Sequence, residues 1–250
     1  MTGAARHGTE QGDPVPTIRE RVADLDWQRV VRDLDERGCA TTGTLLTARE
    51  CGSLAAAFGD EARFRSRVIM ARHNFGRGEY KYFAYPLPDD VQALRESLYP
   101  PLADLANVWE RRLGGPGEFP SDHAGCLARC RDAGQRRPTP LLLGYGEGDF
   151  NCLHQDLYGD LAFPLQVVFL LSAPGEDFTG GELVLTEQRP RMQSRPEVVP
   201  LRQGEGAVFA VNRRPVQGRR GWYRVTMRHG VSRVRSGRRF TLGVIFHDAR

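Results

Sequence analysis

The sequence is almost without lysine: it has 35 lysine and arginine residues, and all of them except Lys81 are arginine. Its five cysteines form no Cys-x-x-Cys pair, and their odd number argues against a disulfide framework or a zinc ribbon. No apolar run approaches the roughly 20 residues of a membrane span, and the N-terminus shows no apolar signal core. Internal repeats and low-complexity blocks are also missing. We therefore expect a cytoplasmic protein with no membrane contact and no obligate protein partner.

Positive charge is unevenly distributed along the chain. Between Arg189 and Arg239 there are fourteen arginines and two acidic residues, a net charge of +12, although the whole chain carries only +4. Such an asymmetry has two interpretations. It is either a solvated basic face or a surface for an anionic partner such as nucleic acid.

Helical patterns dominate the first half. Residues 1–24 are polar and lack periodicity, so we expect a flexible tail. Helices are predicted at residues 25–37, 47–58, 89–112 and 121–133, with a short strand at 39–46. The prolines at positions 100 and 101 should break or kink the third of these helices, because each removes a backbone donor and clashes with the preceding turn.

The stretch from Arg67 to Phe83 mixes basic and aromatic residues around a Gly-Arg-Gly turn. In one interpretation it is a β-hairpin whose aromatic side chains pack in the core. In the other, the aromatic side chains stack on nucleobases while the basic ones contact phosphate. The second interpretation makes candidate substrate-binding residues of Arg77, Tyr80, Lys81 and Tyr82.

From residue 139 onward, short apolar and β-branched runs alternate with Gly/Pro turns. Seven or more such runs predict an antiparallel sandwich or barrel. The fold class is therefore α+β, with a β core in the C-terminal half that the N-terminal helices buttress. We expect a single domain at 25–250, in which 25–138 is mostly helical support and substrate-loop region and 139–250 is the core.

Three residues form a candidate metal site. His154 and Asp156 are two positions apart, so on an extended segment both side chains point to one face. His229 is the best third ligand, because the remaining histidines lie in the tail, before the sheet or beyond its last strand. Two histidines and one carboxylate are the facial triad of non-haem Fe(II) oxygenases, which leaves positions open for a co-substrate and oxygen.

A cation for the co-substrate is found shortly after this third ligand. Iron held by a facial triad needs a bidentate co-substrate, and 2-oxoglutarate needs a cation for its distal carboxylate. Arg239 begins an apolar strand and offers a planar fork that binds carboxylate. Thr241 shares its strand face and adds a hydroxyl donor.

These residues carry a family resemblance. His154-Gln-Asp156, Gly180-Gly-Glu-Leu183, His229-Gly-Val231 and Arg239-Phe-Thr241 together resemble the double-stranded β-helix (jelly roll) of the Fe(II)/2-oxoglutarate-dependent dioxygenases. Within that superfamily the chain is similar to a bacterial group of nucleic-acid oxygenases related to the AlkB-type alkylated-DNA demethylases. The resemblance implies Fe(II) as cofactor and 2-oxoglutarate and O2 as co-substrates. It also implies that Tyr145 binds 2-oxoglutarate; the alternative interpretation of Tyr145 is an aromatic residue of the core.

The resemblance implies DNA repair by oxidative demethylation, with alkylated DNA as the substrate. Two positions depart from the AlkB pattern: Leu143 replaces an asparagine, and Ile245 replaces a second arginine. Both departures leave open a prolyl-type side-chain hydroxylase or a small-molecule hydroxylase of the same superfamily. A further alternative is a barrel without enzymatic activity that binds metal or nucleic acid.

Overall fold

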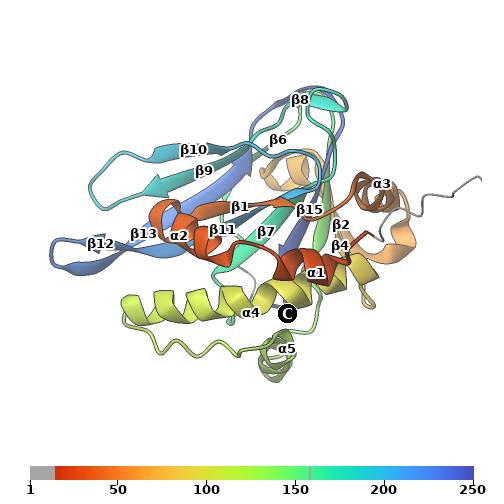
Figure 1. Ribbon diagram of the computed structural model, residues 1–250. Helices are drawn as coiled ribbons and strands as arrows, with labels where there is room; N and C mark the ends of the chain where they lie inside the picture. Colours follow the sequence, from red (N-terminus) through yellow and green to blue (C-terminus); the bar gives the residue numbers. More distant parts are fainter. Residues whose placement is uncertain (1–14, 158) are drawn as a thin grey trace, which may run out of the picture.

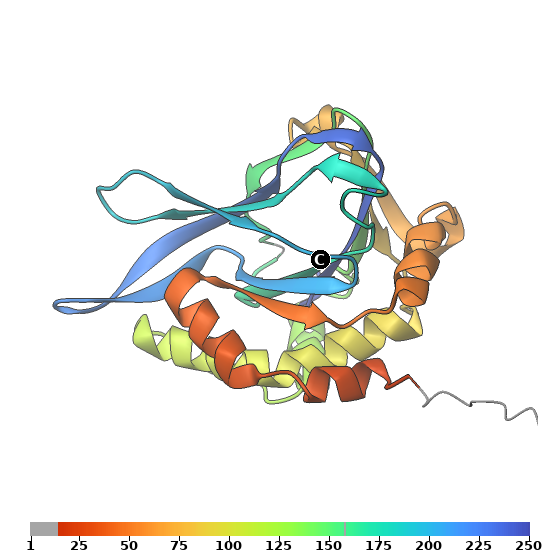
Figure 2. The ribbon, with the colours of Figure 1, turned by 45° about the horizontal axis from the view of Figure 1, so that its top comes forward.

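The computed structural model describes residues 15–157 and 159–250, and its core is made of two antiparallel sheets that face each other (Figures 1 and 2). The larger sheet has seven strands in the order β1-β11-β7-β15-β5-β4-β2, and the smaller has the order β10-β9-β13-β6-β3, with β12 also paired to β13. A short third sheet pairs β14 with β8. The predicted α+β class with an antiparallel core is confirmed.

The strands of the larger sheet come from both halves of the chain. They are β1 (Cys39–Thr44), β2 (Phe64–Ile69), β4 (Glu79–Phe83), β5 (Leu141–Tyr145), β7 (Leu165–Leu170), β11 (Glu205–Ala210) and β15 (Arg239–Ile245). Strands β7 and β15 are buried along almost their whole length, because helices cover one face of this sheet and the second sheet covers the other. Their apolar runs therefore do not alternate with polar residues.

The strands of the smaller sheet alternate more clearly between buried and exposed positions. They are β3 (Gly76–Arg77), β6 (Phe150–His154), β9 (Leu183–Gln188), β10 (Arg195–Val199), β12 (Arg213–Gly218) and β13 (Gly221–Val231), and the small third sheet contains β8 (Phe178–Gly180) and β14 (Val234–Gly237). In β9 every second side chain is buried, beginning with Leu183. One face of this sheet therefore looks into the core and the other toward solvent.

The described residues form five α-helices, which lie outside the larger sheet or beside it (Figure 1). They are α1 (Ile18–Ala23), α2 (Trp27–Arg37), α3 (Ala48–Ala57), α4 (Asp89–Arg112) and α5 (His123–Asp132), with two 3-10 turns, η1 (Glu61–Arg63) and η2 (Met70–His73). The predicted ends of α2, α3 and α5 are confirmed by a left-handed Gly38, a Thr47–Glu50 capping box and an Asp122 cap. None of the helices in the described ranges is long and apolar enough to cross a membrane.

Three expectations need correction. The predicted tail lies outside the described residues up to position 14, but it does not extend to residue 24, because a capping box at Thr17 starts α1. Helix α4 is not broken and continues through Pro100 and Pro101, since its buried face packs on α1 and β15 along its length. Residues 25–138 are more than helical support, because β1, β2 and β4 complete the larger sheet and β3 extends the smaller one.

Candidate metal centre

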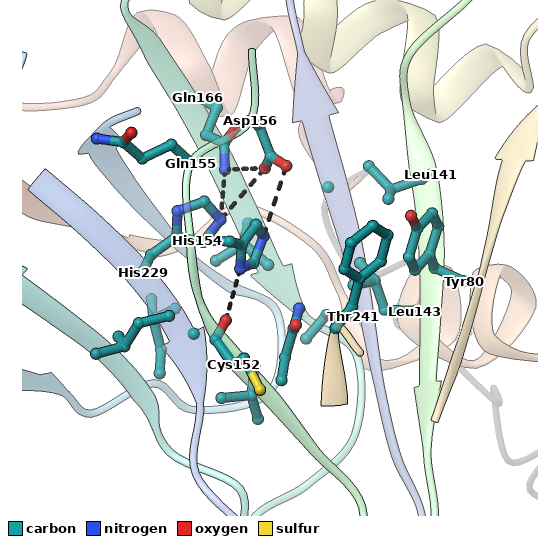
Figure 3. A pocket seen from close by; sticks show the side chains of 18 of the residues that line it. Tyr80, Leu141, Leu143, Cys152, His154, Gln155, Asp156, Gln166, His229 and Thr241 are labelled. Atoms are coloured by element: carbon teal, nitrogen blue, oxygen red, sulfur yellow. Dashed lines mark hydrogen bonds and ion pairs between the residues drawn. The ribbon is translucent and has the colours of Figure 1, made fainter. Parts of the chain in front are cut away.

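Neighbouring strands bring the three predicted ligands together. His229 on β13 is paired directly with His154, the last residue of β6, so both imidazoles lie on the inner side of the smaller sheet. Asp156 follows two residues later, where the chain leaves β6. Figure 3 shows the three side chains pointing at one another inside a pocket. The long sequence gap before His229 is closed by the return of the chain through β7, β9 and β11.

The ligand atoms form one compact group. Nε2 of His229 lies 3.2 Å from Oδ2 of Asp156, and Nε2 of His154 lies 3.5 Å from Oδ1. All three ligand atoms are within 4.8 Å of one another, the only such group of three or more among the described residues. Three donors that converge on one point and leave one side open match the geometry of a facial triad.

The electrostatics of the group favour a bound cation. Burial by itself would raise the pKa of Asp156, but its contacts with His154 and His229 outweigh burial and hold that pKa well below its usual value. Burial lowers the pKa of His229, although Asp156 opposes this shift. For His154, burial would lower the pKa, but hydrogen bonding to Asp156 raises it. The result is a half-buried carboxylate facing two imidazoles, between which a proton or a metal ion must lie.

Two further contacts orient the ligands. Nδ1 of His154 lies 2.8 Å from the carbonyl of Cys152, which places the proton on Nδ1 and leaves Nε2 free to bind a metal. Gln155 points away from the group and donates from its amide to Asn212 Oδ1 (2.7 Å) and to the carbonyl of Met227 (2.8 Å) (Figure 3). The hydrogen bonds of Gln155 thus fix the segment from His154 to Asp156 on the side away from the ligand group.

Gln166 is a site residue that the sequence analysis missed. Its Nε2 donates to Asp156 Oδ2 at 3.0 Å and lies 3.1 Å from His229 Nε2 (Figure 3). Gln166 therefore contacts two of the three candidate ligands. A signal was present in the sequence, because Gln166 is the single polar residue in the apolar run Leu-Gln-Val-Val-Phe-Leu of β7. A polar side chain in a strand buried on both faces requires a partner.

Arg239 and Tyr145 form the second part of the site. They are paired directly across β15 and β5, and the guanidinium carbon of Arg239 lies 5.5 Å from the Tyr145 ring centre. Arg239 is 2% exposed, and its Nε and Nη1 donate no hydrogen bond within the described part of the chain. The Tyr145 hydroxyl is also buried without a hydrogen bond there. Burial lowers the pKa of Arg239 to about 10 and raises that of Tyr145 to about 12, so Arg239 remains charged at neutral pH.

A cavity of about 310 Å³ connects the two parts. The ligand group, Tyr145, Arg239 and Thr241 all line it, and Thr241 is 1% exposed. The adjacent Arg238 is exposed and lies over Phe240, as alternation along the strand predicts. Most of the remaining wall is apolar and includes Leu141, Val167 and Ile245.

Of the four candidate substrate-binding residues, only Tyr80 lines this cavity. Arg77 is exposed on β3. Tyr82 is buried in a small cluster with Leu141 and Ile245, under the guanidinium of Arg65.

The prediction for Lys81 is wrong. Its side chain is 3% exposed and donates to the Phe58 carbonyl (2.8 Å) and to Glu61 (2.6 Å) on the opposite face of the strand. Alternation along β4 separates it from Tyr80 and Tyr82, so it cannot contact a ligand in the cavity.

The residues present fit both groups that the sequence implies. The two histidines and the carboxylate are the donor set for a non-haem iron. A buried arginine whose Nε and Nη1 lack partners among the described residues, beside a buried tyrosine hydroxyl, fits the distal carboxylate of a 2-oxo acid. A buried cation without a partner is costly, so the cavity is suited to an anion.

Several solved structures share this fold. A prolyl-4-hydroxylase from Pseudomonas putida aligns with a TM-score of 0.51 over 90% of this chain and 99% of that chain, at 17% identity. A 2-oxoglutarate–Fe(II) oxygenase family oxidoreductase from Burkholderia pseudomallei gives 0.52 over 90% and 93%, at 16% identity. A prolyl hydroxylase from Trichoplax adhaerens, bound to a peptide of hypoxia inducible factor, gives 0.53 over 92% of each chain, at 16% identity.

Together, the shared fold, the His–Asp–His group and a match to an oxygenase family model over residues 78–249 define the class of protein as a 2-oxoglutarate- and Fe(II)-dependent oxygenase. Fe(II), 2-oxoglutarate and O2 are the cofactor and co-substrates of this class.

Sequence similarity identifies the family more narrowly. Residues 78–249 match the model of the Oxygenase-NA family, described as an oxygenase catalysing oxidative methylation of damaged DNA, and the chain belongs to this family. The proteins MT2286 and Rv2227, from two strains of Mycobacterium tuberculosis, are each 50% identical over 167 residues, which cover 67% of this chain and 72% of theirs.

Proposed function

We propose that this oxygenase removes alkyl groups oxidatively from damaged nucleobases in DNA. The observation that carries the chemistry is that one cavity holds both a His–Asp–His group and the buried Arg239, which has no ion-pair partner among the described residues. The description of the Oxygenase-NA family supports damaged DNA as the substrate class.

In this proposal the residues have separate tasks. His154, Asp156 and His229 hold the iron, and Arg239, Thr241 and Tyr145 hold 2-oxoglutarate. When bound, the iron activates O2 with 2-oxoglutarate as the reductant, giving succinate and carbon dioxide. Gln166 and the Cys152 carbonyl hold Asp156 and His154 in their orientations. The apolar wall excludes water from the reacting carbon.

The net reaction balances for an N-methylated base. One oxygen atom of O2 enters the succinate, and the other enters a C–H bond of the methyl group, giving an N-hydroxymethyl base. This hemiaminal releases formaldehyde and restores the N–H of the base. A base in a duplex would first have to leave the stack to reach the cavity.

The direct test measures succinate and formaldehyde from the full chain supplied with Fe(II), 2-oxoglutarate and an N-methylated single-stranded oligonucleotide. Both products should form in equal amounts with the methylated oligonucleotide, with little of either from the unmethylated one. Asp156→Ala should abolish both. Oxo-acid turnover that no methylated oligonucleotide stimulates would refute the substrate assignment and leave the oxygenase class intact.

The cavity wall also supports a second candidate, a side-chain or small-molecule hydroxylase. Arg239 is the one arginine among the wall residues, and most of the others are apolar. Such a pocket suits a compact apolar group such as a proline ring. Mass spectrometry would show a gain of one oxygen atom on a proline-containing peptide, without release of formaldehyde.

A further inference from the structure

Two β-hairpins project from one end of the molecule (Figures 1 and 2). The first arm, residues 187–197, is the outer part of β9 and β10. The second arm, residues 213–226, is β12 with the first part of β13. Both arms extend the smaller sheet beyond the end of β6, and their outer strands, β10 and β12, are sheet edges.

The second arm begins beside the metal ligands. Strand β6 ends at His154, opposite His229, and β12 then takes the same side of β13, starting where Arg213 pairs with Thr226. The hydrogen bond from Gln155 to Asn212 joins the ligand segment to the residue before β12. The arm therefore continues the line of β6 directly from the metal centre.

The second arm is basic. It contains five arginines and no acidic residue. Arg214 is buried and paired with Glu187, and Arg213 lies 3.5 Å from Glu110. The other three arginines are exposed and make no ion pair within the described part of the chain: Arg219, Arg220 and Arg224.

The first arm adds positive charge at its base and at its tip that acidic residues do not balance. The carboxylate of Glu187 is shared by three arginines, since Arg189 lies 2.7 Å away, Arg195 lies 3.7 Å away and Arg214 is in direct contact. One negative charge thus faces three positive ones. Arg191 at the tip is exposed and has no ion-pair partner among the residues described.

The length of the second arm can be compared with the rise of duplex DNA per base pair. Gly221 at the tip lies eight residues from His229 along β13. Eight residues of extended chain span about 25 Å. Duplex DNA rises about 3.4 Å per base pair, so the tip lies about seven base pairs from the metal centre.

We propose that the two arms grip the phosphate backbone of a nucleic acid about 25 Å from the base that enters the cavity, a span of about seven base pairs in a duplex. The exposed, unpaired arginines neutralise phosphates without reading sequence. This inference rests on the proposed function, because it requires a nucleic-acid substrate. It adds a minimum substrate length, since a short oligonucleotide cannot reach from the cavity to the arms.

The test compares wild type with a triple variant, Arg219→Ala, Arg220→Ala and Arg224→Ala. The matched control is Arg49→Ala, Arg131→Ala and Arg136→Ala, which removes three exposed arginines from α3, α5 and the following loop that make no ion pair within the described ranges. Affinity for a 21-nucleotide single strand is measured by fluorescence anisotropy across a salt series. The same variants are assayed for turnover with a centrally methylated 21-mer and a methylated 5-mer.

We expect the triple variant to bind the 21-mer about tenfold more weakly at 0.1 M salt, with the slope of log affinity against log salt smaller by about two. Its KM should rise for the 21-mer only, with kcat unchanged, and the control should match wild type.

Two results would overturn the inference. One is that the triple variant binds the 21-mer as tightly as wild type does. If this variant also aggregates, the arginines serve only to prevent edge-to-edge association of the sheet. The other is a loss of affinity for anionic phosphatidylglycerol vesicles in place of DNA. If the arms bind DNA but no methylated oligonucleotide is turned over, the proposed function fails and the binding surface stands.

Discussion

Gln166 contacts two of the candidate metal ligands, Asp156 and His229. It lies directly across the sheet from Ile245, the position where the AlkB pattern has its second arginine, and it donates to Asp156. A carboxylate held by such a neighbour keeps one orientation toward a metal ion. The departure at Ile245 therefore does not leave Asp156 without a polar neighbour.

Gln166→Leu removes this donor with little change of volume. We expect Mn(II) affinity, measured by calorimetry in place of the oxidisable Fe(II), to fall roughly 10- to 100-fold. Gln203→Leu is the control, because Gln203 is half-buried and donates to a backbone carbonyl, at Leu171, away from the triad. Equal metal affinity in both variants would show that Gln166 only fills space.

Arg239 allows a test with two opposite readouts. Arg239→Met removes the cation expected to bind the distal carboxylate, so the dissociation constant of 2-oxoglutarate should rise about 100-fold or more. The same change removes a buried charge whose Nε and Nη1 have no partner among the described residues, so the ligand-free protein should gain about 1–3 kcal/mol of stability.

Calorimetric titration and urea unfolding measure these two quantities. Arg238→Met serves as the control, since Arg238 is exposed and immediately precedes β15. Weaker 2-oxoglutarate binding accompanied by lower stability would mean that Arg239 has a structural partner.

At the scale of elements, α4 shows how packing overrides a local signal. Proline cannot donate to the carbonyl four residues earlier, so Pro100 and Pro101 leave two carbonyls of the helix without their usual backbone partner. The helix persists because buried side chains before and after the prolines, such as Leu98 and Leu102, pack in one core cluster. Tertiary contacts thus outweigh the unfavourable helix propensity.

Pro100→Ala restores one donor within α4. We expect the free energy of unfolding to rise by about 1–3 kcal/mol, as measured by urea denaturation. Pro88→Ala is the comparison, because Pro88 is the N-cap of the same helix, where no backbone donor is needed. No gain from Pro100→Ala would indicate that the proline ring makes core contacts of equal value.

At the scale of the whole molecule, two buried histidines make stability depend on pH. His123 and His247 are 4% and 1% exposed, and burial lowers the pKa of each to about 4. His123 also lies 2.9 Å from the Phe246 carbonyl, next to His247 in sequence. Both join α5 and the residues after β15 to the core in their neutral forms.

These histidines predict acid destabilisation above the range in which carboxylates titrate. The unfolded chain takes up protons below about pH 6.5, whereas the folded chain resists until about pH 4, so stability is lost as pH falls. Between pH 7 and pH 5 the loss should be about 2–4 kcal/mol for both histidines together. His123→Leu should roughly halve the dependence of the free energy of unfolding on pH, measured by urea denaturation at a series of pH values. An unchanged slope would mean that His123 titrates normally.

The sequence by itself determined the local features of this protein. The caps of α2, α3 and α5 and the position of β5 depend on neighbouring residues, so they could be predicted from short patterns. The spacing of His154 and Asp156 depends only on the two-residue repeat of an extended chain. The remaining ligand, His229, could be selected because few other histidines lie in the sheet region.

Only the tertiary structure decided which side chains contact one another across neighbouring strands. It placed Gln166 on Asp156 and Tyr145 beside Arg239, and it turned Lys81 away from the cavity. It also recruited β1, β2 and β4 into the larger sheet and extended the basic hairpins from the metal centre. These features depend on strand order and register, which are set by burial in the assembled core and not by residues adjacent in sequence.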